Sequence, residues 1–420
     1  MTRNFAGYRR PIRRISGAGS LCCLMAACGA PAPDPAAIHE RALTLDTHVD
    51  IPLDFATAAV DPLDGDLQVN LQKMTTGGFD AAFFIVYVGQ TARTPENYAA
   101  ARADAFTKFA AIRRMAQELY PDRIEIAYTA ADVERISAAG KLVAAIGVEN
   151  GYSIGTDLAV LDEFHALGGR YFGLVHNGDN DLAHSAQPRT ELGDAPAESA
   201  GVTELGARAI ERLNELGVMV DVSHASKRSS LDAMRLSRAP VIASHSSVRA
   251  LTDHPRNMDD ETLLALRDDG GVIQIVAFDA YLKAQPPEQQ TAVRELRERF
   301  AISGSVTAES LPAEQRTEYQ RALAAIDARW PPATVADLVD HVDYAVRLIG
   351  IDHVGISSDF HGGGGVIGWA DATETPNVTA ELLRRGYDEA AIGKLWSGNL
   401  LRVWREAERV ASELAGTGSA

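Results

Sequence analysis

Residues 218–245, VMVDVSHASKRSSLDAMRLSRAPVIASH, contain the pattern that decides the fold. Two short apolar runs, Val218 to His224 and Val241 to His245, lie on either side of a longer and more polar segment, and both runs end in Ser-His. Runs that are apolar almost throughout are typical of strands in a parallel sheet that is buried on both faces. The stretch therefore predicts a strand, a helical connection and a second strand parallel to the first.

The same alternation extends along the chain in both directions. Strands are predicted at six further runs: Thr44 to Ile51, Ala81 to Val88, Val143 to Glu149, Tyr171 to His176, Gly271 to Phe278 and Val354 to Phe360. Between the strands, apolar residues recur at helical spacing in segments such as Asn97 to Leu119, Asp157 to Leu167, Thr203 to Leu216 and Asp259 to Asp268. Eight alternations favour an α/β fold of the (β/α)₈ class, a TIM barrel.

An open, doubly wound sheet is the alternative fold. That fold commonly carries Gly-x-Gly-x-x-Gly after an early strand, and this sequence has no such motif there. Gly362 to Gly365 follow the last predicted strand, so they resemble a flexible loop more than a phosphate-binding turn.

Residues 281–332 are too long for a simple connection between barrel elements. This segment is highly charged, and we interpret it as a partly helical insertion after strand seven that could cover the barrel mouth. Residues 41–420 would then form one catalytic barrel domain.

The first 40 residues have a composition of their own. Five arginines precede a short apolar run, which is too short to span a bilayer and is typical of an export signal at residues 1–27. Met25-Ala26-Ala27-Cys28 resembles the bacterial lipobox, which predicts that Cys28 is lipidated after cleavage, although an ordinary cleaved signal is the alternative. The proline-rich residues 28–40 would form an extended tether. We therefore expect a protein exported to the bacterial periplasm and anchored to the membrane only through Cys28.

Charge and cysteine content exclude several kinds of partner and site. The formal net charge is -17, so the surface should repel nucleic acid and anionic lipid headgroups. Cys22, Cys23 and Cys28 are the only cysteines, so the mature domain has no disulfide. Any metal ion would therefore be held by histidines and carboxylates.

Titratable side chains fall at the carboxyl ends of the predicted strands. In a (β/α)₈ barrel these ends form the rim of the active site. The residues at these positions are His48, Asp50, Glu149, His176, His224, His245 and Asp359.

Five of these residues predict a metal site. His48 and Asp50 are two residues apart, so on a strand both side chains point to the same face. His224 and His245 end successive strands in nearly the same local sequence. With Glu149 they supply nitrogen and oxygen ligands that zinc accepts, and enough for two ions if Glu149 bridges. Taken singly, each residue also has a plainer interpretation: a chance pair for His48 and Asp50, a surface ion pair for Glu149, and core histidines for the other two.

The order of these motifs resembles that of the membrane (renal-type) dipeptidase family. The resemblance covers about residues 43–406 and rests on Asp46-Thr47-His48-Val49-Asp50, Gly147-Val148-Glu149-Asn150-Gly151, Leu174-Val175-His176-Asn177, Val222-Ser223-His224, Ser244-His245-Ser246, Ser358-Asp359-Phe360 and Asn399-Leu400-Leu401-Arg402-Val403. It implies a metallo-dipeptidase that cleaves small dipeptides with a free C-terminal carboxylate, by means of a hydroxide that bridges two zinc ions.

The resemblance also implies a role for each site residue. His48 and Asp50 would hold one Zn²⁺, His224 and His245 the other, and Glu149 both.

Substrate contacts and proton transfer are implied for three further residues. His176 would contact the substrate and help to polarise the scissile carbonyl, and Arg256 would bind the substrate carboxylate with its planar fork. Asp359 would take the proton from the attacking hydroxide and pass it to the leaving amine. Without the resemblance, Arg256 could be a solvated surface residue and Asp359 a structural cap.

The sequence departs from the family pattern at one position. Asp-Phe-Asp-Gly is common on strand eight, and this chain has Asp359-Phe360-His361-Gly362, which leaves the preferred C-terminal residue of the substrate open. His184 and His361 lie near the predicted mouth, and neither is assigned to a metal.

Two other functions compete with the dipeptidase. An amidohydrolase or lactonase usually has His-x-His on strand one and a carboxylated lysine on strand four, which this chain lacks. A binding lipoprotein without activity would have lost ligands, which this chain retains. The resemblance leaves a homodimer open, because dimerisation is common in the family.

Overall fold

The computed structural model describes residues 34–302, 308 and 311–417. The predicted signal peptide, Cys28 and most of the tether lie outside the described residues. One compact unit comprises Pro35–Ala420 and begins with the short helix α1 (Pro35–Arg41). In the described part of the chain, no helix is both long and apolar enough to cross a membrane.

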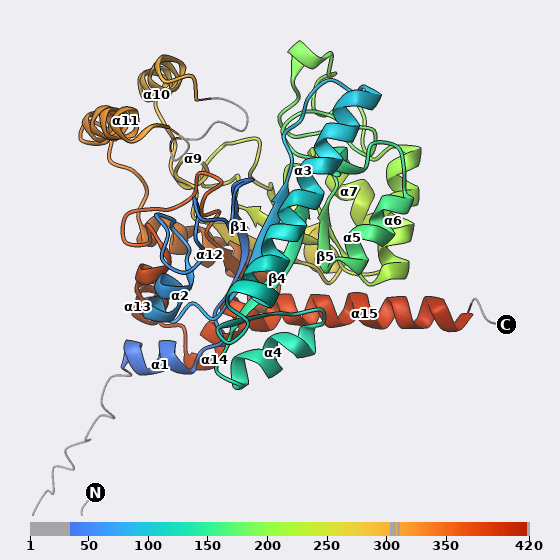
Figure 1. Cartoon of the computed structure of the whole chain (residues 1–420), viewed down its shortest axis with the longest axis horizontal. Coiled ribbons are helices and arrows are strands. Elements are labelled where there is room, and N and C mark those ends of the chain that lie inside the picture. The colour runs from blue at the N-terminus through green and yellow to red at the C-terminus, as the bar shows by residue number, and fades with distance from the viewer. Residues whose placement is uncertain (1–33, 303–307, 309–310, 418–420) are drawn as a thin grey trace, which may run out of the picture. The chain divides into compact units, whose positions relative to one another are not determined.

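Eight parallel strands form a nearly closed barrel, which confirms the predicted fold (Figure 1). Neighbouring strands pair in the order β1, β2, β4, β5, β6, β7, β8 and β9. The ring closes where Val49 bridges Phe360 and the backbone N–H of Asp50 donates to the carbonyl of Phe360 at 2.9 Å. The strands are β1 (Leu45–Asp50), β2 (Ala81–Tyr87), β4 (Leu142–Glu149), β5 (Gly169–Gly173), β6 (Met219–Asp221), β7 (Ile242–Ser246), β8 (Val272–Val276) and β9 (Val354–Ser357).

A ninth strand, β3 (Ile124–Ile126), was not predicted. It pairs with Leu142–Ala144 at the start of β4 and takes no part in the ring.

Side chains alternate in direction along each strand, so the core has two layers, one inside the barrel and one between the strands and the outer helices. On β2, Phe83 and Ile85 point into the barrel, while Phe84 and Val86 pack under the surrounding helices. Inside, the ring of Phe83 lies 5.4 Å from that of Trp404, which comes from the closing helix α15 (Asn399–Thr417). Figure 1 shows α15 (red) running across one end of the strands, so the amino end of the barrel is plugged and the carboxyl end remains for chemistry.

The outer helices follow the predicted segments within a few residues. The four named above appear as α3 (Pro95–Arg114, continued by a π-helical turn at Met115–Leu119), α5 (Ala159–Ala166), α6 (Glu204–Leu216) and α8 (Asp260–Asp268). The other longer helices of the barrel are α4 (Ala130–Ala138), α7 (Lys227–Leu236), α12 (Val335–Ile349) and α13 (Thr375–Arg384), with short α2 (Leu71–Gly77) and α14 (Glu389–Gly393). Side chains cap many of their first turns; Thr334 and Asp337, for example, form a reciprocal capping box at α12.

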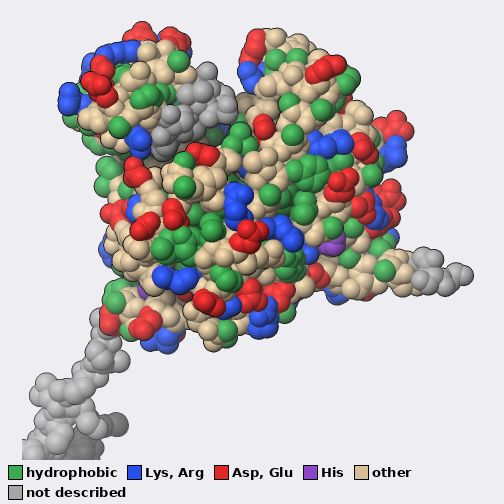
Figure 2. Space-filling view, viewed as in Figure 1, with side chains coloured by type: hydrophobic (Ala, Val, Ile, Leu, Met, Phe, Trp, Pro, Cys, Tyr) green, Lys and Arg blue, Asp and Glu red, His purple; other side chains and the backbone are tan. Residues whose placement is uncertain are grey.

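The segment after β8 is largely helical. It contains α9 (Asp279–Leu282), α10 (Pro287–Arg299) and α11 (Ala313–Asp327), and a small core of Leu296, Ile302, Leu311 and Tyr319 joins the last two helices. Arg316 Nη1 lies 2.9 Å from Asp66 Oδ2 in the loop after β1. In Figure 2 this lobe projects from the barrel, with a hollow between it and a second projection. The insertion thus flanks the mouth.

Candidate metal centre

The barrel brings the seven predicted site residues together at its carboxyl end. His48 and Asp50 lie on β1, Glu149 is the last residue of β4, and His245 lies on β7. His176, His224 and Asp359 follow β5, β6 and β9, which end at Gly173, Asp221 and Ser357. The predicted strands were therefore too long there. His224 and Asp359 have φ values of 68° and 58°, a left-handed conformation that no strand residue can adopt.

Glu149 is the centre of the cluster. Its Oε1 lies 3.1 Å from His224 Nε2, 3.3 Å from His245 Nε2 and 3.9 Å from His176 Nε2. Its Oε2 lies 3.5 Å from His48 Nε2. One carboxylate thus faces histidines from four different strands or the loops that follow them.

Three overlapping groups of side chains could each hold a metal ion. They are His48, Asp50 and Glu149; Glu149, His224 and His245; and His48, His245 and Asp359, with ligand atoms within 4.8 Å of one another in each group. The first two groups share Glu149. Asp50 Oδ1 and Glu149 Oε1 are buried and have no hydrogen-bond partner. Because an unpaired buried carboxylate oxygen is costly, these atoms fit cation ligands.

Each histidine of the first two groups is oriented by a hydrogen bond on its outer side. Each Nδ1–H donates to an oxygen of a neighbouring residue, so each Nε2 is turned toward the cluster. The acceptors are Tyr171 Oη for His48 (2.9 Å), Asn177 Oδ1 for His224 (2.9 Å) and Ser244 Oγ for His245 (2.8 Å). Tyr171 donates to the carbonyl of Thr47, and Ser244 donates to Asp221 Oδ2 at 2.6 Å.

Burial and mutual charge perturb the pKa values of the cluster. Burial lowers the pKa of His224 and His245 well below the usual range, so both are neutral and can act as ligands. Burial also lowers the pKa of His48, but Glu149 and Asp50 outweigh it and raise that pKa well above 6.5. In the same way, burial raises the pKa of Glu149, but His48 and His176 outweigh it and lower that pKa. The carboxylates of Asp50 and Glu149 therefore need nearby positive charge in this buried cluster.

Asp359 differs from the other carboxylates. Burial raises its pKa well above 3.8, and Asp50 and Glu149 raise it further against the opposing effect of His48. Its Oδ1 lies 3.8 Å from His48 Nε2. A carboxyl group with a raised pKa at this position is suited to hold a proton.

His176 and Arg256 border the cluster. The His176 ring lies between those of Tyr87 (4.7 Å) and His224 (4.0 Å), and burial lowers its pKa. Arg256 is only 3% exposed, which excludes a solvated surface residue.

The Arg256 guanidinium keeps a donor free. Its Nη2 donates to the carbonyl of His245 at 3.0 Å, and its Nη1 lies 3.4 Å from Ser246 Oγ, while its Nε is buried without a partner. Arg256 and His224 also line a cavity of about 200 Å³.

His361 and His184 lie outside the cluster and serve the surrounding loops. His361 Nε2 accepts hydrogen bonds from the backbone N–H groups of Gln68 (2.9 Å) and Val69 (3.3 Å). His184 Nδ1 lies 2.9 Å from Asp179 Oδ2. The histidine that departs from the family pattern therefore binds the loop after β1.

Several residues that support the site were not predicted from the sequence. Tyr171 and Asp221 lie within predicted strands, before the strand ends at which the site residues gather, so no local pattern marks them. Gly362 also went unnoticed as a packing position. A Cβ atom there would collide with Asp359 Oδ1 and Asp50 Oδ2, so any larger residue would displace these carboxylates.

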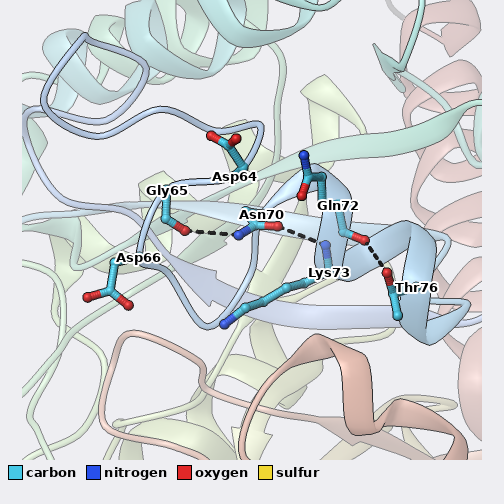
Figure 3. Close-up of a pocket in the computed structure, with 7 residues that line it drawn as sticks. All are labelled: Asp64, Gly65, Asp66, Asn70, Gln72, Lys73 and Thr76. Atoms are coloured by element: carbon cyan, nitrogen blue, oxygen red, sulfur yellow. Dashed lines mark hydrogen bonds between the residues drawn. The ribbon is translucent and has the colours of Figure 1, made fainter.

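A second hollow of about 420 Å³ lies over the loop after β1 and α2 (Figure 3). Its side chains are engaged locally: Asn70 Nδ2 donates to the carbonyl of Gly65 at 2.9 Å, and Lys73 pairs with Asp371 at 2.9 Å. In Figure 3 the carboxylates of Asp64 and Asp66 point apart. This hollow therefore lacks the converging ligands of the barrel mouth.

A parallel barrel with buried histidines and carboxylates at its carboxyl end defines a metal-dependent hydrolase of the barrel class. A sequence model of the membrane dipeptidase family (peptidase family M19) matches residues 34–417. The chain belongs to this family, and it is a dipeptidase of the metallopeptidase type.

Individual relatives agree with this assignment. The chain is 33% identical over 353 residues to the dipeptidase tcpJ of Claviceps purpurea, covering 83% of this chain and 71% of that protein. The crystal structure of the probable dipeptidase PvdM from Pseudomonas aeruginosa is 39% identical with a TM-score of 0.79, covering 90% of this chain and 98% of that one. A metallo peptidase from Rhodobacter sphaeroides, solved with a phosphinate mimic of L-Ala-D-Ala, is 25% identical with a TM-score of 0.66, covering 87% and 99%.

Proposed function

We propose that the protein hydrolyses the peptide bond of small dipeptides that have a free C-terminal carboxylate, and that it binds two Zn²⁺ per subunit with a bridging hydroxide. The observation that carries the proposal is the position of Glu149 between two sets of ligands. The phosphinate dipeptide mimic on the Rhodobacter sphaeroides relative supports the substrate class.

Five residues would hold the metal. His48 and Asp50 would bind one ion, His224 and His245 the other, and Glu149 both. Such a pair would lower the pKa of a shared water to about 7 and polarise the scissile carbonyl.

Asp359 is the proposed proton carrier. Its raised pKa and its position beside His48 let it take a proton from the attacking oxygen and return the proton to the leaving amine. It would act first as general base and then as general acid.

His176 and Arg256 are the proposed substrate ligands. The neutral imidazole of His176 can donate a hydrogen bond to the carbonyl oxygen as negative charge develops there. The free Nε–H of Arg256, with an adjacent Nη, can grip the terminal carboxylate in two places.

The site of action is proposed from the sequence. We propose that the enzyme is exported to the bacterial periplasm and is held at the membrane through a lipid on Cys28. Because dimerisation is common in the family, we also propose that the protein forms a homodimer.

A panel of dipeptides tests the proposed function. We expect purified protein to release free amino acids from dipeptides, to bind two zinc ions per chain by mass spectrometry, and to lose activity with a chelator and regain it with Zn²⁺. N-acetylated and C-amidated dipeptides serve as controls, and the amidated one should be poor because Arg256 loses its partner. Hydrolysis that is indifferent to chelation would refute the metal mechanism.

A further inference from the structure

Lys108 on α3 is a buried cation that the proposed mechanism does not use. It is 6% exposed. Among the described residues its Nζ has no hydrogen bond or ion pair, and it lies over the ring of Tyr87, 5.5 Å from the ring centroid. Burying an ammonium group without an anionic partner is costly, and a cation–π contact repays only part of that cost. The position therefore suits an anion that arrives from outside the chain.

Tyr87 connects Lys108 with the metal centre. It is the last residue of β2, its register partner on β4 is Glu149, and its ring lies 4.7 Å from that of His176. The carboxylates of Asp50, Glu149 and Asp104 raise the pKa of Lys108 against the larger lowering effect of burial. Lys108 thus lies within electrostatic reach of the cluster.

The barrel order places Lys108 across the mouth from Arg256. β2 and β7 are four strands apart in a ring of eight, so their carboxyl ends face each other. Arg256 follows β7, and Lys108 contacts the end of β2. A dipeptide whose terminal carboxylate is bound by Arg256, and whose peptide bond lies at the centre, would extend its amino-terminal residue toward Tyr87 and Lys108.

Lys108 differs from the other cation on this side of the mouth, because Arg189 is ion-paired with Glu191 at 2.7 Å. Asp104, one turn earlier on α3, raises the pKa of Lys108 but forms no ion pair with it among the described residues. A carboxylate on the side chain of the substrate's amino-terminal residue would give Lys108 a direct partner.

We propose that Lys108 binds the side-chain carboxylate of an aspartyl or glutamyl residue at the amino-terminal position of the dipeptide, and so makes the enzyme selective for acidic amino-terminal residues. The inference rests on the proposed function and adds to it a substrate class.

Matched substrates isolate the charge. Glu-Ala and Gln-Ala have the same shape and differ only in the side-chain charge, as do Asp-Ala and Asn-Ala. We expect the wild-type kcat/KM for Glu-Ala to exceed that for Gln-Ala about tenfold or more, the size expected of a charged hydrogen bond. Lys108→Met should bring this ratio close to one, and Lys108→Arg should keep most of it.

The control variant is Lys141→Met, because Lys141 bonds to Glu125 and the carbonyl of Pro121 at the opposite end of the barrel. It should keep both the ratio and the zinc content of the wild type. Lys108→Gln provides a second neutral variant if the methionine variant is poorly folded.

The outcomes separate the two proposals. If no dipeptide is cleaved, the proposed function itself is wrong. If Ala-Ala is cleaved but Glu-Ala and Gln-Ala are cleaved equally well, only the role of Lys108 is refuted. An unchanged ratio in Lys108→Met, with or without altered zinc content, would likewise refute it and leave Lys108 a structural residue.

Discussion

Single atoms decide whether the cluster can bind metal. His48, His224 and His245 each donate from Nδ1 to an oxygen of a neighbouring residue, which turns Nε2 of each ring toward the cluster, where it can bind a metal ion. Removal of one of these oxygens would leave the ligand in place but free to rotate or change tautomer. The residues outside the ligand set are therefore part of the site.

Asp359→Asn should separate proton transfer from metal binding. Asparagine keeps the shape but cannot carry the proton, so we expect kcat to fall by about 10²- to 10⁴-fold while the zinc content stays near two per chain. Glu149→Gln is the contrasting variant, because it weakens the ligand that we propose both ions share, and it should lose metal as well as activity. Full turnover in Asp359→Asn would show that another group carries the proton.

The sequence identified the seven side chains that the structure gathers at the barrel mouth, because histidines and acids that end apolar runs form a local pattern. It could not identify Tyr171 or Lys108. The support that Tyr171 gives to His48 and the role proposed for Lys108 depend on which strand lies beside or opposite them, and that information is not local.

At the scale of elements, strand ends were harder to predict than strands. The predicted strands ran on to His176, His224 and Phe360, because apolar residues continue close to those positions. In the structure the strands end at Gly173, Asp221 and Ser357, and the left-handed backbone at His224 and Asp359 is incompatible with a strand. β3 was missed because it is only three residues long and has Glu125 at its centre.

His341 on α12 should make stability depend on pH. Its Nδ1 accepts from the backbone N–H of Val248 at 3.1 Å and its Nε2 donates to the carbonyl of Leu282 at 3.1 Å, so the neutral ring joins α12 to the loop after β7 and to α9. Burial lowers its pKa to about 4. Because the unfolded chain takes up the proton at about 6.5, the stabilisation is complete above that pH and is lost as the pH falls toward 4.

We expect the loss to reach about 2 kcal/mol between pH 7.5 and pH 5. Urea unfolding of metal-free wild type and His341→Gln at both pH values measures it, since glutamine cannot titrate. The difference in unfolding free energy between the two proteins should shrink by that amount at pH 5. A difference that does not change with pH would show that His341 titrates normally.

The whole barrel could be predicted because its pattern repeats eight times, so an error at one strand hardly affects the count. Closure through Val49 and Phe360, by contrast, joins residues more than three hundred positions apart, and no local pattern encodes such a pairing. The helical content of the segment after β8 was predicted in part from the sequence, but its small core of Leu296, Ile302, Leu311 and Tyr319 was not.

Cys28→Ser tests the location of the whole molecule. In a bacterial host we expect the wild type to appear in the membrane fraction with a lipid-sized mass increase on its amino-terminal peptide. The variant should be released from the membrane. Cys23→Ser, within the predicted signal, is the matched control and should behave as the wild type. Wild-type protein without lipid in the soluble periplasmic fraction would indicate an ordinary cleaved signal.

Gly362 sets a boundary for laboratory evolution of this enzyme. Any other amino acid there would drive its first side-chain carbon into two carboxylates of the reaction centre, so randomised libraries that include this codon would return mostly inactive clones. New substrate preferences should be sought instead by varying the walls around Tyr87 and Arg256, where a larger or smaller side chain alters the fit without displacing the chemistry.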